Sequence, residues 1–403
     1  MLKFEKLLKR PQFYLASGFV MISLTAGLLY TGTTLTAQKQ RSLTLASENT
    51  RIQDRLNSLN TELSITAQEL SALQNQDQIK RNETLEEEIK NIQKTYKEAV
   101  DEYENLLKLK EQTNKTADLD KLFTEALSFL ADRNYSSAAA TLLSLKNGIQ
   151  KKRTEVASSF QIPANVPVQN APPGNGYRRQ TVETPIGQYL VDIIAADLNS
   201  TRVIVDTASD GTCTNDCPAL SLGDYAGRSG AYAAINGPYF CPADYPSCED
   251  KKNSFDTLLM NKNKTYFNSD NNVYSTVPAV IFSAGSARFV GQSLEWGRDT
   301  GPDSVIASQP MLLSDGNIVF GGDGEPKRGS KGSRSFIGTA DNMVYIGVVY
   351  NATVAEVAYV LKSLGLKYAL NLDGGGSTAL WSGGRYLAGP GRNTPFGILF
   401  VGR

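Results

Sequence analysis

An acidic residue and a run of glycines follow an apolar segment near the C-terminus of the chain. Leu366–Leu372 is predicted to form a buried strand, and Asp373 follows it directly. The next residues are Gly374, Gly375, Gly376, Ser377 and Thr378. A glycine run lets a ligand approach the backbone closely, and successive free N–H groups in such a turn bind anions. Asp373 is therefore a candidate catalytic or ligand-positioning carboxylate beside a phosphate or a sugar, and a plain solvated turn is the alternative.

The composition excludes several kinds of active site. The chain has 403 residues and no histidine, so a Ser-His-Asp triad, a histidine base and a histidine-ligated zinc are excluded. No lysine follows the glycines, so the turn is not a phosphate-binding P-loop. Ser377 has no histidine to activate it and is expected to make a turn hydrogen bond. Any chemistry must therefore use carboxylates, lysines, tyrosines, cysteines, backbone amides or a metal held by oxygens.

Length and charge set broader limits. A chain of 403 residues accommodates two or three domains. With 41% hydrophobic and 20% charged residues, most of it is expected to be ordered. The net charge is zero, which gives no electrostatic reason to expect a nucleic-acid partner.

The N-terminus has the pattern of a membrane anchor. Residues 1–12 form a basic tail, and the apolar segment 13–35 is long enough to cross a bilayer. The basic flank predicts a single-pass protein with its N-terminus in the cytoplasm and its C-terminal domain outside the cell. A cleaved signal peptide is the alternative. We favour an uncleaved anchor, because the apolar run exceeds that of a typical signal peptide.

A long polar segment with heptad spacing follows. Residues 40–112 are nearly free of glycine and proline, and apolar residues recur at three- and four-residue intervals. The first of these are Leu56, Leu59, Leu63, Leu70 and Leu73. The pattern predicts a coiled-coil stalk and thus a homo-oligomer, with one helix folding back on another of the same chain as the alternative. Residues 117–156 are predicted to form a helical hairpin at the end of the stalk.

A Pro/Asn/Gly-rich linker, residues 157–176, precedes the C-terminal domain, residues 177–403. Many short segments rich in Val and Ile predict strands there. Thr353 and Glu356 form a capping box that begins a helix, and Gly365 ends it. The predicted fold class is α+β: a transmembrane helix, an α-helical coiled-coil stalk and a mixed, β-rich α/β domain.

All four cysteines lie in the C-terminal domain. They are Cys213, Cys217, Cys241 and Cys248. An extracellular domain is expected to contain disulfides, and four cysteines allow three pairings. Zinc is the alternative, but the spacing fits the usual zinc motifs poorly.

Three segments of residues 177–403 resemble motifs of the phosphodiester glycosidase domain family. Ala234–Phe240 is similar to the family's Asn-Gly-Gly-Phe-Phe motif, and Arg334–Gly338 is similar to its Arg-Thr-Ala-Ile-Gly motif. Asn371–Ser377 matches the most specific motif of the family. Pro238 stands where the family has a second glycine, which removes one N–H from that loop. The resemblance implies cleavage of a sugar from a phosphodiester, as in the animal enzyme that removes N-acetylglucosamine to uncover mannose 6-phosphate.

These motifs suggest a role for each site residue. Asp373 and Arg334 are the predicted catalytic pair, and Arg392 is a second clamp for the phosphate, because a guanidinium matches phosphate oxygens. The predicted substrate-binding residues are Asn236, Gly237, Asn371, Gly374, Gly375, Gly376, Ser377 and Arg392. Glycoside cleavage usually employs two carboxylates. The candidates for the second are Asp192, Asp256 and Asp315.

The sequence therefore predicts a membrane-anchored extracellular hydrolase that cleaves sugar-1-phosphodiester linkages in envelope or exogenous glycans. A non-catalytic protein that binds polysaccharide, or assembles envelope or exopolysaccharide material, is the main alternative. A stalk-borne scaffold with a purely structural C-terminal domain is the third. The predicted partners are a glycan or sugar-phosphate substrate, the membrane and further copies of the chain. No cofactor is predicted, although a calcium ion held by Asp373 and nearby oxygens is compatible with the sequence.

Overall fold

The computed structural model describes residues 11–74, 77–269, 276–297, 299 and 301–403. They form two compact units, Met1–Lys90 and Asn91–Arg403, which are described separately. The expected basic tail, residues 1–12, lies outside the described residues except for the first two residues of a helix.

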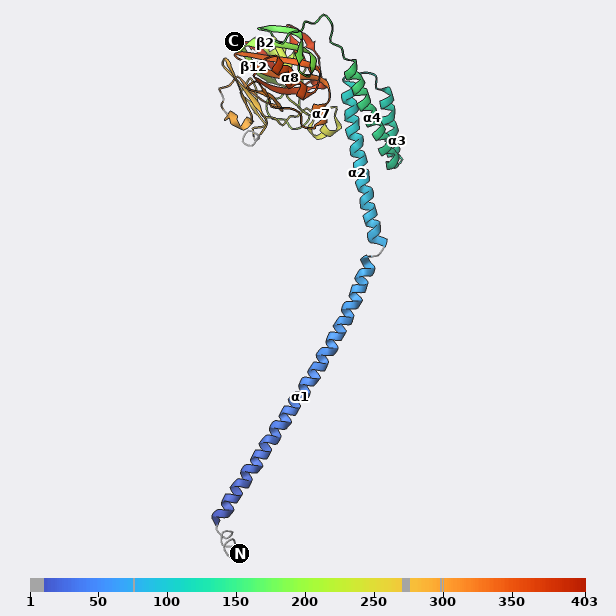
Figure 1. Cartoon of the computed structure of the whole chain (residues 1–403), viewed down its shortest axis with the longest axis vertical. Helices are drawn as coiled ribbons and strands as arrows, with labels where there is room; N and C mark the ends of the chain where they lie inside the picture. Colours follow the sequence, from blue (N-terminus) through green and yellow to red (C-terminus); the bar gives the residue numbers. More distant parts are fainter. Residues whose placement is uncertain (1–10, 75–76, 270–275, 298, 300) are drawn as a thin grey trace. The chain divides into compact units, whose positions relative to one another are not determined.

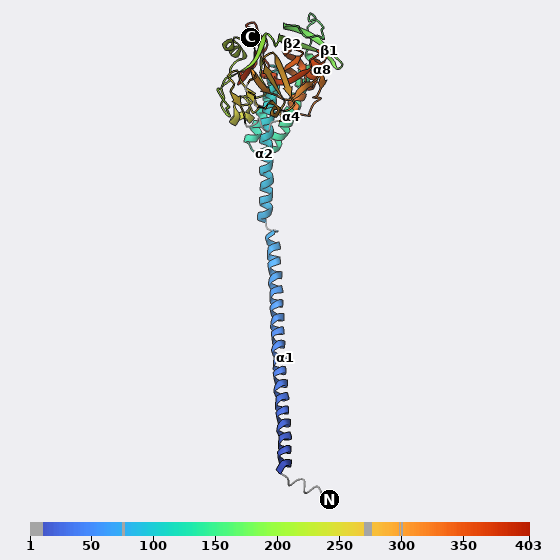
Figure 2. The same ribbon diagram turned by 90° about the vertical axis from the view of Figure 1, so that its left-hand side faces the viewer.

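The first unit is helical. Helix α1 (Pro11–Gln74) is unbroken in both side views (Figures 1 and 2), and α2 (Asp77–Lys110) begins in this unit. One helix near the N-terminus contains a window long and apolar enough to cross a membrane, and none of that window is buried. A signal sequence has the same length and composition. The structure thus agrees with an apolar N-terminal helix of either kind.

The heptad leucines of the expected stalk are exposed. Leu56, Leu59, Leu63, Leu70 and Leu73 are each at least 54% exposed in the single chain. The apolar stripe of this unit is therefore open to solvent in the single chain, and the coiled coil between chains stays a prediction.

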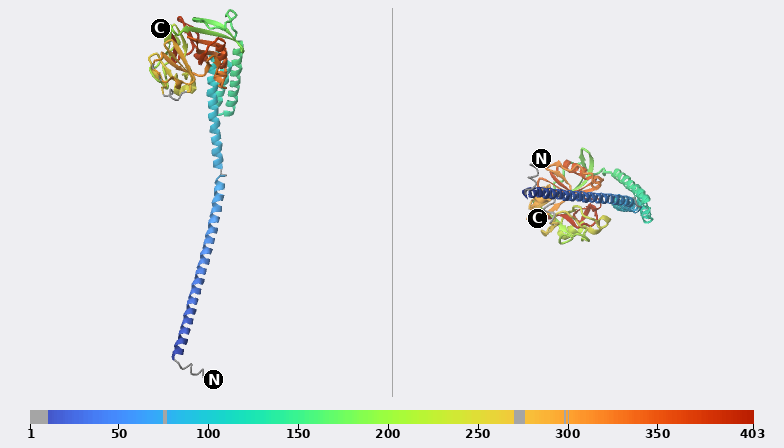
Figure 3. Two further views of the ribbon diagram at one scale, coloured as in Figure 1. Left: turned by 60° about the vertical axis from the view of Figure 1, so that its left-hand side comes forward. Right: turned by 90° about the horizontal axis from the view of Figure 1, so that it is seen from below.

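The second unit begins with three packed helices, residues 91–159, which we call the helical module. Helix α2 lies beside α3 (Ala117–Ala131) and α4 (Tyr135–Ser159), as Figures 1 and 3 show. Their shared core contains Ala99, Leu106, Leu109, Leu119, Ala126, Leu130, Ala138, Leu142, Leu145 and Ile149. In the last part of the expected stalk, Ala99, Leu106 and Leu109 are therefore buried against the hairpin of the same chain and not against another chain. This is the fold-back arrangement considered above as the alternative.

Three antiparallel sheets form the C-terminal domain. The largest has seven strands in the order β1-β2-β13-β12-β14-β10-β11, and the other two have five strands each, in the orders β16-β15-β4-β17-β3 and β6-β5-β9-β7-β8. The strands of the large sheet are β1 (Gly176–Thr184), β2 (Gly187–Asp197), β10 (Met311–Ser314), β11 (Asn317–Ile318), β12 (Gly332–Ala340), β13 (Met343–Ala352) and β14 (Tyr368–Gly374). Those of the second sheet are β3 (Thr201–Thr207), β4 (Ala233–Asn236), β15 (Leu380–Ser382), β16 (Arg385–Ala388) and β17 (Phe396–Gly402). Those of the third are β5 (Leu259–Met260), β6 (Tyr266–Phe267), β7 (Ala279–Ser283), β8 (Ser286–Val290) and β9 (Ser304–Ala307).

Short helices complete the domain. They are α5 (Leu222–Ser229), α7 (Pro326–Gly329), α8 (Val354–Ser363) and the 3₁₀ turns η1 (Pro246–Lys251), η2 (Ser293–Trp296) and η3 (Gly375–Ser377). Helix α8 has the expected capping box, since Thr353 accepts from the amide of Glu356 and Glu356 accepts from that of Thr353. The mixed helix and sheet content confirms the general fold class.

Successive side chains of a strand point to opposite faces of the sheet. Both faces of the large sheet are buried, each against its own apolar core. On β13, Ile346 and Val348 face the core shared with the other two sheets. Tyr345 and Val349 face a second core, to which α8 contributes Val357 and Leu361. The central strands are thereby held rigidly between two apolar layers.

The linker and the cysteines also take defined places. The second half of the linker pairs with β1, where Thr181 donates its N–H to the carbonyl of Pro167 over 2.9 Å. Cys213 is bonded to Cys217, and Cys241 to Cys248, so the structure selects one of the three pairings. Both bridges stiffen loops of the C-terminal domain.

Gly338, the last residue of the Arg334–Gly338 motif, is expected to be essential for packing. A Cβ there would stand 2.7 Å from the carbonyl oxygen of Tyr368, a backbone atom that cannot move aside. We expect Gly338→Ala to lower the free energy of unfolding by about 1–3 kcal/mol. Thermal unfolding of the full chain in detergent, followed by circular dichroism, measures the change. Gly227→Ala is the matched control, because a Cβ on this α5 glycine meets nothing within 4 Å; equal melting of the two variants would contradict the packing argument.

Candidate active site

The motifs at Arg334 and Asp373 meet because their strands are antiparallel neighbours. The start of β12 lies beside the end of β14, and Arg334 pairs with Gly374 across the two strands. The motif at Asn236 comes from β4 in another sheet, and the N–H of Asp373 donates to the carbonyl of Gly237 over 3.1 Å. Three segments distant in the sequence thus converge on one place.

The buried side chain of Asn236 links two of the sheets through hydrogen bonds. Its Oδ1 accepts hydrogen bonds from the Ser335 hydroxyl at 2.7 Å and from the Ala379 amide at 3.1 Å. Its Nδ2 donates to the carbonyl oxygens of Asp373 at 2.8 Å and Gly237 at 3.2 Å. Only 1% of the residue is exposed. These bonds use the hydrogen-bonding groups of the amide, so Asn236 positions the segments around Asp373. Its contact with a sugar stays a prediction.

Asn371 is buried as well. Its Nδ2 donates to the hydroxyl of Tyr239 and to the carbonyl of Leu372, at 2.7 and 2.8 Å. Burial also raises the pKa of Tyr239 to about 12, so the phenol stays protonated at neutral pH. Asn371 therefore holds Tyr239 in place, and Tyr239 is the member of this pair that lines the cavity described below.

Asp373, the predicted catalytic carboxylate, lines the cavity described below. It lies at the end of β14, where Oδ1 accepts the N–H of Gly374 at 2.9 Å. Burial raises its pKa from 3.8 to about 6, although hydrogen bonds from Ser377 and Gly374 and the charge of Arg392 oppose the increase. Such a carboxylate exchanges a proton near neutral pH, as an acid or base in catalysis must. The hydrogen bond from Ser377 therefore stabilises the ionised form of Asp373.

The glycines allow the tight approach that this turn requires. A Cβ on Gly374 would stand 2.8 Å from the carbonyl oxygen of Ser333, and Gly375 has φ +59°, which favours glycine. A Cβ on Gly237 would stand 2.1 Å from the ring of Phe396. A side chain at any of these three positions would therefore clash with a neighbour or strain the backbone.

Arg334 is buried and bonded to backbone carbonyls. Its Nε donates to the carbonyl of Ala352 at 3.1 Å, and its Nη2 donates to those of Lys327 and Ser330, at the end of α7. Burial lowers the pKa of this guanidinium. Its Nη1 lies over the glycine turn, 3.4 Å from the position of a Cβ on Gly374. Arg334 therefore orders the loop after α7 and presents one edge to the turn; its role on phosphate stays a prediction.

Arg392 is bonded to a residue that sequence reasoning missed. Its Nη2 pairs with Oε1 of Glu111, in the helical module, and its guanidinium lies 5.2 Å from the centre of the Tyr245 ring. The amide of Gly376 donates to Oε2 of Glu111 at 2.8 Å. No local pattern marks Glu111, because its heptad context predicts a stalk; only the fold brings it to the glycine turn.

These groups surround a cavity of about 700 Å³ between the domain and the helical module, which we call the active-site cavity. Of the predicted site residues it is lined by Arg334, Asp373, Gly374, Gly375, Gly376, Ser377 and Arg392. The helical module contributes Glu111, Lys108 and Arg153, among others. Burial lowers the pKa of Lys108 to about 8, and its Nζ lies 5.2 Å from the centre of the Tyr245 ring.

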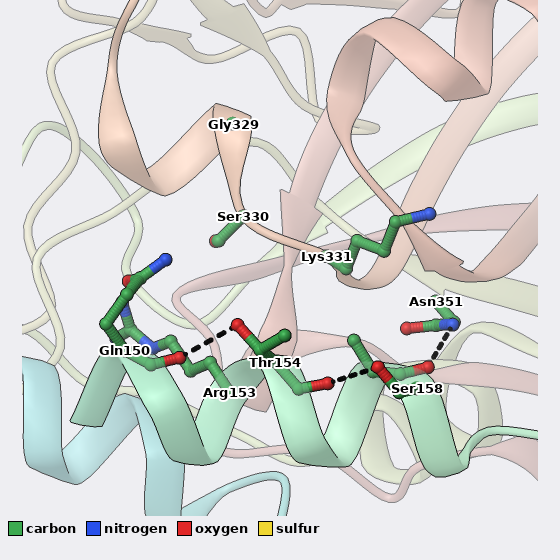
Figure 4. A pocket seen from close by; sticks show the side chains of 9 residues that line it. Gln150, Arg153, Thr154, Ser158, Gly329, Ser330, Lys331 and Asn351 are labelled. Atoms are coloured by element: carbon green, nitrogen blue, oxygen red, sulfur yellow. Dashed lines mark hydrogen bonds between the residues drawn. The ribbon is translucent and has the colours of Figure 1, made fainter. Parts of the chain in front are cut away.

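A second, smaller cavity of about 440 Å³ lies beside α4. Figure 4 shows Gln150, Thr154 and Ser158 on this helix, facing Ser330, Lys331 and Asn351 of the domain. Asn351 donates to the carbonyl of Ala157 at 2.9 Å. None of the predicted site residues is among its lining residues.

The three guesses for a second carboxylate do not line the active-site cavity. Asp192 is fully buried and pairs with Arg179, Tyr177 and Tyr350. Asp315 stands in the turn between β10 and β11, and Asp256 also lies away from the cavity lining. The register between these loops and β14 depends on the tertiary fold, so the sequence alone does not show which carboxylates lie near Asp373.

Among the described residues, no group of three or more Cys, Asp or Glu side chains is placed to hold a metal ion. The calcium ion that the sequence allows at Asp373 is not tested by this structure.

A family comparison agrees with this arrangement. Residues 229–401 match the family model described as phosphodiester glycosidase. This range contains all three motifs, so the C-terminal part of the chain is similar to the phosphodiester glycosidase domain. No curated protein matches the chain.

Several solved structures are similar to part of the chain. A hypothetical protein from Synechocystis is 15% identical, with TM-score 0.44; the match covers 56% of this chain and 62% of that protein. The catalytic domain of zebrafish N-acetylglucosamine-1-phosphodiester alpha-N-acetylglucosaminidase, auto-inhibited by its pro-peptide, is 14% identical, with TM-score 0.44 and coverage of 59% and 87%. Both TM-scores are below 0.5, so the family assignment rests on the sequence match.

The raised pKa of Asp373 predicts a pH-dependent effect on stability. The folded protein holds this proton more tightly than the unfolded chain, so ionisation destabilises the fold as pH rises between about 4 and 6. We expect Asp373→Asn to melt at a higher temperature than the wild type near pH 8, with the gain vanishing near pH 4. Thermal melts across this range test it. Asp315→Asn is the control, and a gain for Asp373→Asn that is independent of pH would show that its charge is not the cause.

Proposed function

We propose that the protein hydrolyses sugar-1-phosphodiesters at the active-site cavity. The observation that carries this proposal is the position of Asp373, a carboxylate with a raised pKa, beside the amides of the glycine turn and the guanidinium of Arg392. The amide of Gly376 and Arg392 already bind a carboxylate, so they are competent to bind an anion. The match to the phosphodiester glycosidase family supports the same reaction.

In the proposed reaction the phosphate binds to Arg392 and the Gly376 amide, with Arg334 beside them. The bond between the anomeric carbon and the phosphate oxygen breaks, and its electron pair leaves with the phosphate. Water attacks the anomeric carbon, and ionised Asp373 accepts the proton of that water. The products are the free sugar and a phosphomonoester. A phosphate leaves readily as an anion, so this reaction depends less on an acid than ordinary glycoside cleavage does.

The remaining parts of the chain suggest where this reaction occurs. We propose that the apolar N-terminal helix anchors the protein in the cell membrane and that the C-terminal domain is extracellular, which the two disulfides support. The exposed heptad leucines support association of several copies through α1. The substrate would then be a phosphodiester-linked glycan of the envelope or its surroundings.

Hydrolysis of N-acetylglucosamine-1-phospho-methyl ester, within a panel of sugar-1-phosphodiesters, tests the proposal. The full chain in detergent should release free sugar, and Asp373→Asn should lower kcat by about 100- to 10,000-fold because the base is lost. Asp315→Asn is the matched control, since it removes a carboxylate outside the cavity. Saturable binding of sugar phosphates without any release of sugar would instead indicate a glycan-binding protein.

The pH profile tests the ionisation state of Asp373. Because the ionised form acts as the base, kcat/KM should rise with pH through a midpoint near the pKa of about 6. Initial rates across the range from about pH 4.5 to 8.5 measure it. A rate that falls as pH rises through this midpoint would show that the protonated form is the active one.

A further inference from the structure

Glu111 of the helical module contacts the glycine turn. It follows the end of α2 and stands outside the residues that match the family model, 229–401. Its Oε2 accepts the N–H of Gly376 at 2.8 Å, and its Oε1 pairs with Nη2 of Arg392. The hydroxyl of Tyr245 lies 3.5 Å from the same Oε1. The carboxylate thus meets donors from three parts of the domain.

The contact with Gly376 leaves no free space between them. A Cβ on Gly376 would stand 2.3 Å from Cδ of Glu111 and 2.4 Å from its Oε1. The side chain of Glu111 is only 20% exposed, and that of Arg392 19%. The carboxylate therefore fills the surface of the turn and excludes another anion from it.

Other contacts hold Glu111 in this place. Glu104, two turns earlier on α2, accepts the N–H of Ser247 at 2.9 Å. Asn351 donates to Ala157 at the end of α4, also at 2.9 Å. The helical module is therefore docked at points away from the glycine turn, and Glu111 is presented to Arg392 by that docking. Burial in turn raises the pKa of Glu111 and opposes the ionised form that the pair with Arg392 favours.

The donors that Glu111 occupies are those that the proposed function assigns to the phosphate. One N–H and one guanidinium edge bind a single anion well, and a carboxylate and a phosphate oxygen use the same geometry. We propose that Glu111 occupies the anion subsite and determines its specificity, so that a substrate phosphate binds only by displacing this carboxylate. The inference rests on the proposed function for the identity of that anion.

Binding of inorganic phosphate, measured by calorimetry on the full chain in detergent, tests this inference without requiring turnover. Glu111→Gln keeps the shape of the side chain and removes its charge. It should lower the Kd for phosphate roughly tenfold or more, because a charge-assisted competitor is lost. Glu98→Gln is the matched control: the same change on the same helix, at a side chain that pairs with Lys94 and does not line the cavity. It should leave Kd within about twofold of the wild type.

Two further variants make the result decisive. Adding Arg392→Lys to Glu111→Gln should abolish the gain, because the subsite loses its bidentate donor. If Glu111→Gln fails to fold, Glu111→Asp takes its place. This variant keeps the charge but shortens the side chain, and it should also lower the Kd for phosphate. An unchanged or increased Kd in the Glu111 variants would overturn the inference.

The outcomes separate this inference from the proposed function. Tighter phosphate binding by Glu111→Gln with no hydrolysis of any donor leaves the subsite inference standing and contradicts the proposed reaction. Hydrolysis by the wild type with no effect of Glu111→Gln on phosphate affinity would support the proposed reaction and overturn the subsite inference. A loss of hydrolysis in Glu111→Gln without tighter phosphate binding would identify Glu111 as a group the reaction needs, and would also overturn the inference.

Discussion

The side chain of Asn236 is the constraint on which the candidate site depends. Its amide joins the ends of β4 and β14 and contacts Ser335 of β12 and Ala379, so that one buried group fixes strands of two sheets. A buried amide is costly unless its polar groups are bonded. Because three of its four hydrogen bonds go to other segments, the need to satisfy this amide defines the relative position of those segments.

A second consequence concerns charge. The hydrogen bonds of Asn236 hold the backbone of Asp373 in a buried position, and this burial raises the pKa of its carboxyl group. The glycine turn compensates in part, since the amide of Gly374 and the hydroxyl of Ser377 bind the carboxylate. The site therefore retains a carboxylate that is unfavourable for stability when ionised, as is common where proton transfer is required.

The helical module changes the composition of the site. The matched domain presents cationic and amide donors at the glycine turn, and the module supplies the anion that meets them in this structure. Lys108 and Arg153 of the module also line the cavity. One wall of the cavity thus comes from outside the family domain, so the domain alone does not define the site.

The local features can be predicted from the amino-acid sequence: the strand that leads to Asp373, the capping box of α8, the apolar N-terminal helix and the motif glycines. These depend on neighbouring residues, whose periodicity and backbone preferences are visible in the chain. The folded protein is needed to show the disulfide pairing, the hydrogen bonds of Asn236, the burial of Leu106 and Leu109 in the helical module and the contact of Glu111 with Gly376. Each of these depends on contacts between residues distant along the chain. A heptad pattern cannot distinguish a partner helix of another chain from one of its own, because both bury the same apolar stripe.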